Sequence, residues 1–167
     1  MNKKSIKKII ALFLACIVFC TACGKSGGSA DTAETIEGDL MDIMAQIYEG
    51  VNLDAETKEA IQGYVSDTLT AENEQAILGT TDIPYKEGIY SVPMMSSIAY
   101  QCVLLRVEPD EVETVKEQLK ANADVDKWVC VSAETVLVEN RGDLVLFIMS
   151  DKDTAYAVSA SFQALSK

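Results

Sequence analysis

The sequence predicts an α+β protein, with N-terminal helices followed by a strand-strand-helix-strand-strand-helix unit and a mainly antiparallel sheet. Three observations predict this class. Apolar residues recur at helical spacing from residue 36, and short β-like runs begin near residue 88. These runs come in pairs joined by short connections, which favour antiparallel pairing. Residues 36–167 are long enough to form a single α+β domain that buries its own core.

Two helices are expected at the start of this domain. The first covers residues 36–51, where one apolar stripe consists of Ile36, Leu40, Ile43, Met44, Ile47, Tyr48 and Val51. The second covers residues 54–69 and begins with Asp54 as a capping residue. Gly63 lies inside this second helix, where it costs about 1 kcal/mol relative to alanine. Residues 70–84 are expected to form a loop.

A pair of strands and a helix are expected next. Residues 89–97 and 99–107 carry Tyr, Val, Ile and Cys in β-like runs. Pro93 cannot donate a ladder hydrogen bond, so the first run is expected to be an edge strand or to carry a bulge. The helix covers residues 109–123, where Asp110 and Glu113 have the spacing of a capping box and the inward stripe is Val112, Val115 and Leu119.

The last part of the domain predicts two strands and a helix. Residues 134–139 and 143–150 are the strands, and Gly142 lies in the turn between them. Since residues 144–149 are all apolar, the second strand is expected to lie centrally, covered on both faces. The final helix is capped by Asp151 and buries Ala155, Val158, Phe162 and Leu165.

The N-terminus has the layout of an export signal. Four lysines and no acid precede a short apolar run, which is the order of a secretory signal peptide and is too short for a membrane span. The stretch from Cys20 to Cys23 resembles the bacterial lipobox. This resemblance implies a lipoprotein signal peptide over residues 1–22, cleavage between Ala22 and Cys23, and lipid attachment at Cys23. An ordinary cleaved signal peptide is the alternative.

The expected location follows from this signal. Residues 23–35 are small and polar and predict a flexible tether. The protein is therefore expected to be lipid-anchored at the outer, extracytoplasmic face of the cell membrane. Cleavage would change the net charge from -12 to -16, since the signal holds four lysines and no acid. Such a charge repels nucleic acid and anionic lipids, and it indicates either a basic partner, cation binding or a well-solvated surface.

Three segments carry a family resemblance, residues 41–51, 87–119 and above all 126–151. They resemble a family of small lipoproteins of clostridial-type Gram-positive bacteria that is defined by a domain of unknown function. The resemblance covers roughly residues 38–166. It implies a cell-surface lipoprotein with the strand and helix order given above. It supplies no catalytic residue.

The residue inventory restricts the chemistry. The chain has no histidine, which excludes Ser-His-Asp and Cys-His nucleophilic sites and histidine-based zinc sites. No cofactor, metal site or catalytic residue is expected. Cys102 and Cys130 form a candidate thiol pair that could be a disulfide, or Lys127 could activate Cys130. The alternative is that both cysteines pack as small hydrophobic residues.

A candidate interaction surface consists of Tyr90, Met94, Met95 and Trp128, which are simply core if they are buried. The function expected is a non-catalytic binding or protein-interaction module that recognises an envelope protein or cell-wall component. One alternative is a histidine-free hydrolase of envelope glycans, which requires two carboxylates about 5 to 10 Å apart. The other is a small-solute or metal carrier, which requires a deep pocket.

Overall fold

The computed structural model describes residues 36–166 of the chain. The predicted signal peptide, the tether of residues 23–35 and the lipidation site at Ala22 and Cys23 lie outside the described residues.

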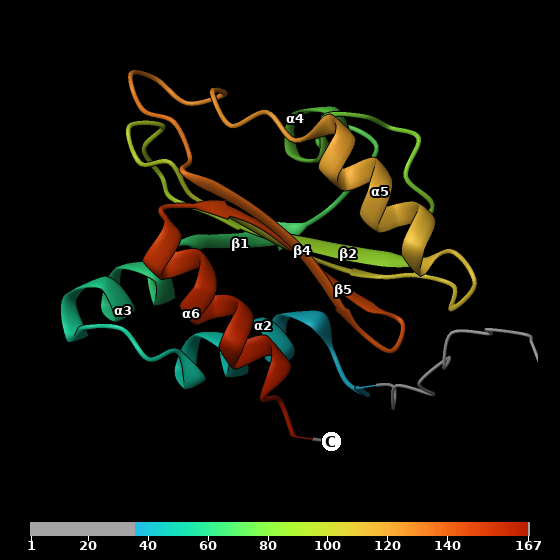
Figure 1. Cartoon of the computed structure of the whole chain (residues 1–167), viewed down its shortest axis with the longest axis horizontal. Coiled ribbons are helices and arrows are strands. Elements are labelled where there is room, and N and C mark those ends of the chain that lie inside the picture. Colours follow the sequence, from blue (N-terminus) through green and yellow to red (C-terminus); the bar gives the residue numbers. More distant parts are fainter. Residues whose placement is uncertain (1–35, 167) are drawn as a thin grey trace, which may run out of the picture. The chain divides into compact units, whose positions relative to one another are not determined.

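A five-stranded sheet organises these residues (Figure 1). Its order is β1-β2-β3-β5-β4, and every neighbouring pair is antiparallel. The strands are β1 (Val65–Thr68), β2 (Glu87–Val92), β3 (Gln101–Arg106), β4 (Thr135–Arg141) and β5 (Leu144–Ser150). The predicted α+β class with an antiparallel sheet is therefore confirmed.

Helices cover both faces of the sheet (Figure 1). One face carries α2 (Leu40–Gly50), α3 (Ala55–Gln62) and α6 (Lys152–Gln163). The other face carries α4 (Glu74–Leu78) and α5 (Val112–Asn122). Two apolar clusters result, one in each layer between helices and sheet. We call them the α2–α6 core and the α4–α5 core.

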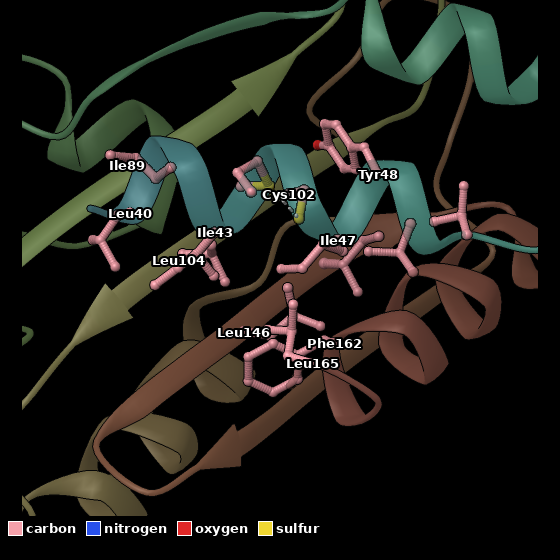
Figure 2. Packing of buried hydrophobic residues seen from close by; sticks show 14 of the residues in the cluster. Leu40, Ile43, Ile47, Tyr48, Ile89, Cys102, Leu104, Leu146, Phe162 and Leu165 are labelled. Atoms are coloured by element: carbon pink, nitrogen blue, oxygen red, sulfur yellow. Dashed lines mark hydrogen bonds between the residues drawn. The ribbon is translucent and has the colours of Figure 1, made fainter. Parts of the chain in front are cut away.

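The interior strand β5, which lies between β3 and β4, serves both cores. All seven of its residues are buried, and successive side chains alternate between the two faces of the sheet. Leu146 and Ile148 join the α2–α6 core, whereas Phe147 and Met149 join the α4–α5 core. Figure 2 shows Leu146 below α2, close to Phe162 of α6. The sequence prediction of a central strand covered on both faces is correct.

The predicted second helix is shorter than expected. It ends at Gln62, and Gly63 caps it by donating its backbone N–H to carbonyls of the last turn. The residues that follow form β1, an edge strand whose four side chains are all exposed. Because β1 pairs with β2 in the register Val65↔Val92, β2 is not at the edge of the sheet. Of the two alternatives predicted for residues 89–97, an edge strand or a bulge, the edge strand is wrong. The strand β2 ends before Pro93, so the proline is outside the ladder.

Two further local predictions are corrected. Residues 70–84 contain the short helix α4, whose C-cap Gly79 has the left-handed conformation (φ 79°) that glycine adopts without strain. The Asp110 and Glu113 capping box is not formed, since the residue before α5 is Glu111 and it makes no side-chain capping bond. Glu113 instead pairs with Lys116 at 2.8 Å. The inward stripe of α5 is buried as predicted.

The cap of α6 forms as predicted. Asp151 Oδ1 accepts the backbone N–H of Thr154 at 2.9 Å, and Oδ2 accepts the Ser150 hydroxyl at 3.1 Å. Burial acts to raise the pKa of Asp151, but these hydrogen bonds outweigh it and hold the pKa below its ordinary value. Replacing Asp151 by alanine is therefore expected to lower the free energy of unfolding by about 1 kcal/mol at pH 7.

The same substitution has a defined pH dependence. The pKa of Asp151 in the folded state lies below its unfolded-state value of about 3.9. The contribution of Asp151 to the free energy of unfolding is therefore complete above the unfolded-state pKa and disappears as the pH falls through the folded-state pKa. Urea unfolding from pH 7 to about pH 3 should show the difference from wild type shrinking at the acid end. Asp153→Ala is the matched control, because Asp153 is exposed in the same first turn. Equal losses in both variants would contradict the role of the cap.

Arg106 joins the first described residues to the end of β3. Its Nη1 and Nη2 donate to the carbonyls of Ile36 and Gly38, each at 3.0 Å. Its Nε donates to Glu87 at 2.6 Å, and Nη1 lies 3.6 Å from Asp143 Oδ1. We call these five residues the Arg106 network. The side chains of Arg106 and Asp143 are only 13% and 11% exposed, so the pair lies largely out of water.

Candidate functional site

Two loops meet at one end of the sheet. Residues 93–100 connect β2 to β3, and residues 123–134 connect α5 to β4. The backbone N–H of Val129 donates to the carbonyl of Ser96 at 2.9 Å, which ties one loop to the other. Figure 1 shows both loops projecting beyond the strands on the same side.

Exposed apolar side chains are concentrated on these loops. Among the described residues, six large apolar side chains are exposed, and four of them are Met94 (87%), Met95 (63%), Ile98 (38%) and Val129 (60%). We call these four the loop-end patch. A fifth, Val65, pairs with Val92 at the same end of the sheet. Apolar residues gathered in this way are typical of an interaction surface, and methionine adapts well to a partner's shape.

The predicted surface residues divide into two groups. Met94 and Met95 are exposed, and they lie in the loop after β2 and not within the strand. Tyr90 and Trp128 are half-buried and pack against the α4–α5 core. Ile98 and Val129 were not singled out from the sequence. Each is a single apolar residue in a loop and belongs to no helical or strand periodicity, so the sequence pattern does not distinguish it.

The two cysteines of the folded region have different surroundings, and both are free. Cys102 is fully buried on β3, with its Sγ 3.7 Å from Met44 Sδ, and burial raises the pKa of its thiol to about 12. Cys130 is exposed and follows Val129 in the loop, with a positive φ of 63°. The ammonium of Lys127 is bound elsewhere, to acceptors on α4 and β3.

Lys127 makes a polar bridge across the α4–α5 layer. Its Nζ donates to Gln101 Oε1 at 2.7 Å and to the carbonyl of Ala76 in the middle of α4. Gln101, only 1% exposed, donates its own amide to the carbonyl of Ile77 at 2.8 Å. Burial of the ammonium lowers the pKa of Lys127, while nearby Asp124 acts in the opposite direction. The bridge holds the loop of residues 123–134 against α4 and the sheet.

A cavity of about 330 Å³ opens beside this bridge, between α4, the end of α5 and β5. Its lining includes one carboxylate, Asp124. A second cavity of about 320 Å³ lies between α2 and α6, and its lining also includes one carboxylate, Glu49. Neither cavity presents the pair of carboxylates that the hydrolase hypothesis requires.

The acidic residues of the loop have structural partners. Asp124 Oδ1 accepts the backbone N–H of Asp126 at 3.0 Å, and Asp126 Oδ1 accepts the Ser132 hydroxyl at 2.6 Å.

Within residues 36–166, no three histidine, cysteine, aspartate or glutamate side chains are grouped so that they could hold a metal ion. None of the helices in that same range has both the length and the apolar character to cross a membrane.

Comparison with known proteins adds no relative. The chain matches no protein-family model, no curated protein and no solved structure.

Proposed function

We propose that the protein is a non-catalytic binding module, lipid-anchored through Cys23 at the outer face of the cell membrane, that recognises an envelope protein through the loop-end patch. The anchor rests on the basic and apolar N-terminus and its lipobox-like cysteine. The resemblance to small lipoproteins of clostridial-type bacteria supports the same location. The observation that carries the binding role is the grouping of four exposed apolar side chains on two joined loops.

The hydrogen bonds around the patch support recognition by a preformed surface. Val129 is tied to Ser96, Lys127 to Gln101, and Asp126 to Ser132. A loop held in this way loses little conformational entropy on binding, so more of the contact free energy appears as affinity. The exposed methionines supply adaptable apolar contacts on that rigid base.

The charge of the chain defines the chemistry of the partner. A net charge of -16 after cleavage would repel a second copy of the protein and anionic lipid headgroups alike. The partner surface that fits best has apolar side chains at its centre and basic residues around them. Steering by opposite charges would raise the association rate at low salt.

Site-specific photocrosslinking in native cells tests this proposal. A benzophenone side chain at Met95 is expected to give a discrete protein adduct, whereas the same group at Tyr156 should not. Tyr156 is 52% exposed, on α6, and provides the matched control. Val129→Asp places a charge within the patch and should reduce the Met95 adduct at least about tenfold.

Two outcomes would contradict the proposal. One is the absence of any adduct at Met95, and the other is an identical set of adducts from Met95 and Tyr156. Val129→Asp should leave the free energy of unfolding within about 0.5 kcal/mol of wild type, because Val129 is exposed. A loss of crosslinking in this variant therefore reports on recognition, not on folding.

A further inference from the structure

Among residues 36–166, only two protein groups accept hydrogen bonds from the ammonium of Lys127. An ammonium group carries three N–H donors, and Lys127 uses two of them, on Gln101 and on Ala76. No third acceptor for Lys127 is found in the part of the chain that the structure describes. Lys127 also lines the cavity. A ligand oxygen, above all a carboxylate, can therefore complete its coordination with a charge-assisted bond.

Acceptors line the same cavity. Asn122 and Gln75 each donate their amide nitrogen to a nearby backbone carbonyl, at 2.9 and 2.8 Å, and keep their side-chain oxygens as acceptors. Asp124 uses Oδ1 for the N–H of Asp126 and retains its second oxygen. One positive and one negative side chain thus line the cavity, so a ligand that carries both charges meets both partners.

The remaining lining sets the size and polarity of the ligand. Ile77 of α4 is half-buried and contributes apolar surface, whereas Phe147 and Met149 of β5 border the cavity with only 1% of their surface exposed. A volume of about 330 Å³ is at the lower end of the range of small-molecule sites, roughly 300–1,000 Å³. A single amino acid or a dipeptide fits this size class, whereas an oligosaccharide or an extended peptide exceeds it.

We propose that this cavity binds a small zwitterion, an apolar amino acid or dipeptide, with its carboxylate on Lys127 and its ammonium on Asp124. The apolar side chain of the ligand packs against Ile77. This site is separate from the loop-end patch and goes beyond the proposed recognition of a protein partner. Because Lys127 and Val129 lie in one loop, ligand binding also stabilises the segment that carries part of the patch.

Trp128 provides the readout. It is the only tryptophan of the chain, and Lys127 Nζ lies 5.9 Å from its ring centroid. Titration of the full chain in detergent with L-leucine and with L-alanyl-L-alanine is expected to give a saturable change in emission, confirmed by calorimetry. Acetate, which has only the carboxylate, should bind at least about tenfold more weakly.

Four variants test which side chains hold the ligand. Lys127→Met should weaken leucine binding at least about tenfold, and Lys120→Met, an exposed lysine on α5, should leave it unchanged. Ala76→Phe fills the cavity with Lys127 still present and should also abolish binding. Asp124→Asn should weaken the binding of leucine but not the binding of acetate.

Several results would overturn the assignment. The first is no saturable signal with any probe up to about 50 mM, a range that covers even weak sites. The second is wild-type affinity in Lys127→Met or Ala76→Phe. An equal effect of Asp124→Asn on leucine and acetate would overturn the zwitterion chemistry. Since none of these readouts involves the loop-end patch, failure here leaves the crosslinking result unaffected.

Discussion

Replacing Phe162 by alanine is expected to lower the free energy of unfolding by about 3–5 kcal/mol, a large part of the stability of a domain of this size. Phe162 lies on α6 with no exposed surface, inside the core that joins α6 to α2 and the sheet. Figure 2 shows its ring close to Leu146 and Leu165. Truncation removes the buried ring and leaves a cavity that the surrounding helices cannot fill completely.

Urea unfolding followed by far-UV circular dichroism measures this loss. Tyr156→Ala is the matched control, since Tyr156 is an aromatic residue of the same helix that is 52% exposed. Its truncation should change the free energy of unfolding by much less, about 0.5 kcal/mol. Similar losses in the two variants would mean that α6 packs on the sheet through a different face.

Arg106→Met is expected to cost about 3–5 kcal/mol, because it removes one partner of a largely buried ion pair. The variant loses the bonds to Ile36, Gly38 and Glu87. It also leaves Asp143 without its cation, and Asp143 Oδ1 is buried with no hydrogen-bond partner of its own. An uncompensated carboxylate in this position is the largest part of the expected loss.

Two comparisons make the Arg106 result specific. Lys86→Met breaks an exposed pair with Glu108, 45% and 61% exposed, and should cost at most about 1 kcal/mol. Adding Asp143→Asn to Arg106→Met removes the orphaned charge and should restore part of the stability. Hydrogen exchange at residues 36–40 should accelerate in Arg106→Met and not in Lys86→Met. If the two single variants are equally stable, the Arg106 network contributes no more than a surface pair.

The fold was predictable where the apolar pattern of a single segment was enough to identify a buried helix or strand. The unbroken apolar run of β5 and the stripes of α5 and α6 identify buried elements without reference to the rest of the chain. The strand β1 was missed because its four side chains are all exposed, so it has no apolar alternation. Its conformation depends on pairing with β2, which a local pattern does not contain. The edge placement of β2 followed from Pro93, which lies just beyond the end of the strand.

The candidate sites were predictable only in part, for the same reason. Met94 and Met95 stand out as two adjacent methionines after a proline. Val129 and Ile98 join them through a contact between distant loops, fixed by the bond from Val129 to Ser96. The cavity beside Lys127 likewise depends on residues of α4 and β5, which are far apart in the sequence and line the same cavity. Long-range packing of this kind is set by the tertiary fold.

The strand β3 connects two features of the domain that lie at its opposite ends. The strand begins at Gln101, directly after the loop that carries Met94, Met95 and Ile98, and ends at Arg106, which holds the carbonyls of Ile36 and Gly38. Six residues of strand separate these two ends by about 17 Å. Under the proposed function, a partner on the loop-end patch would therefore bind at the end of β3 opposite the first described residues.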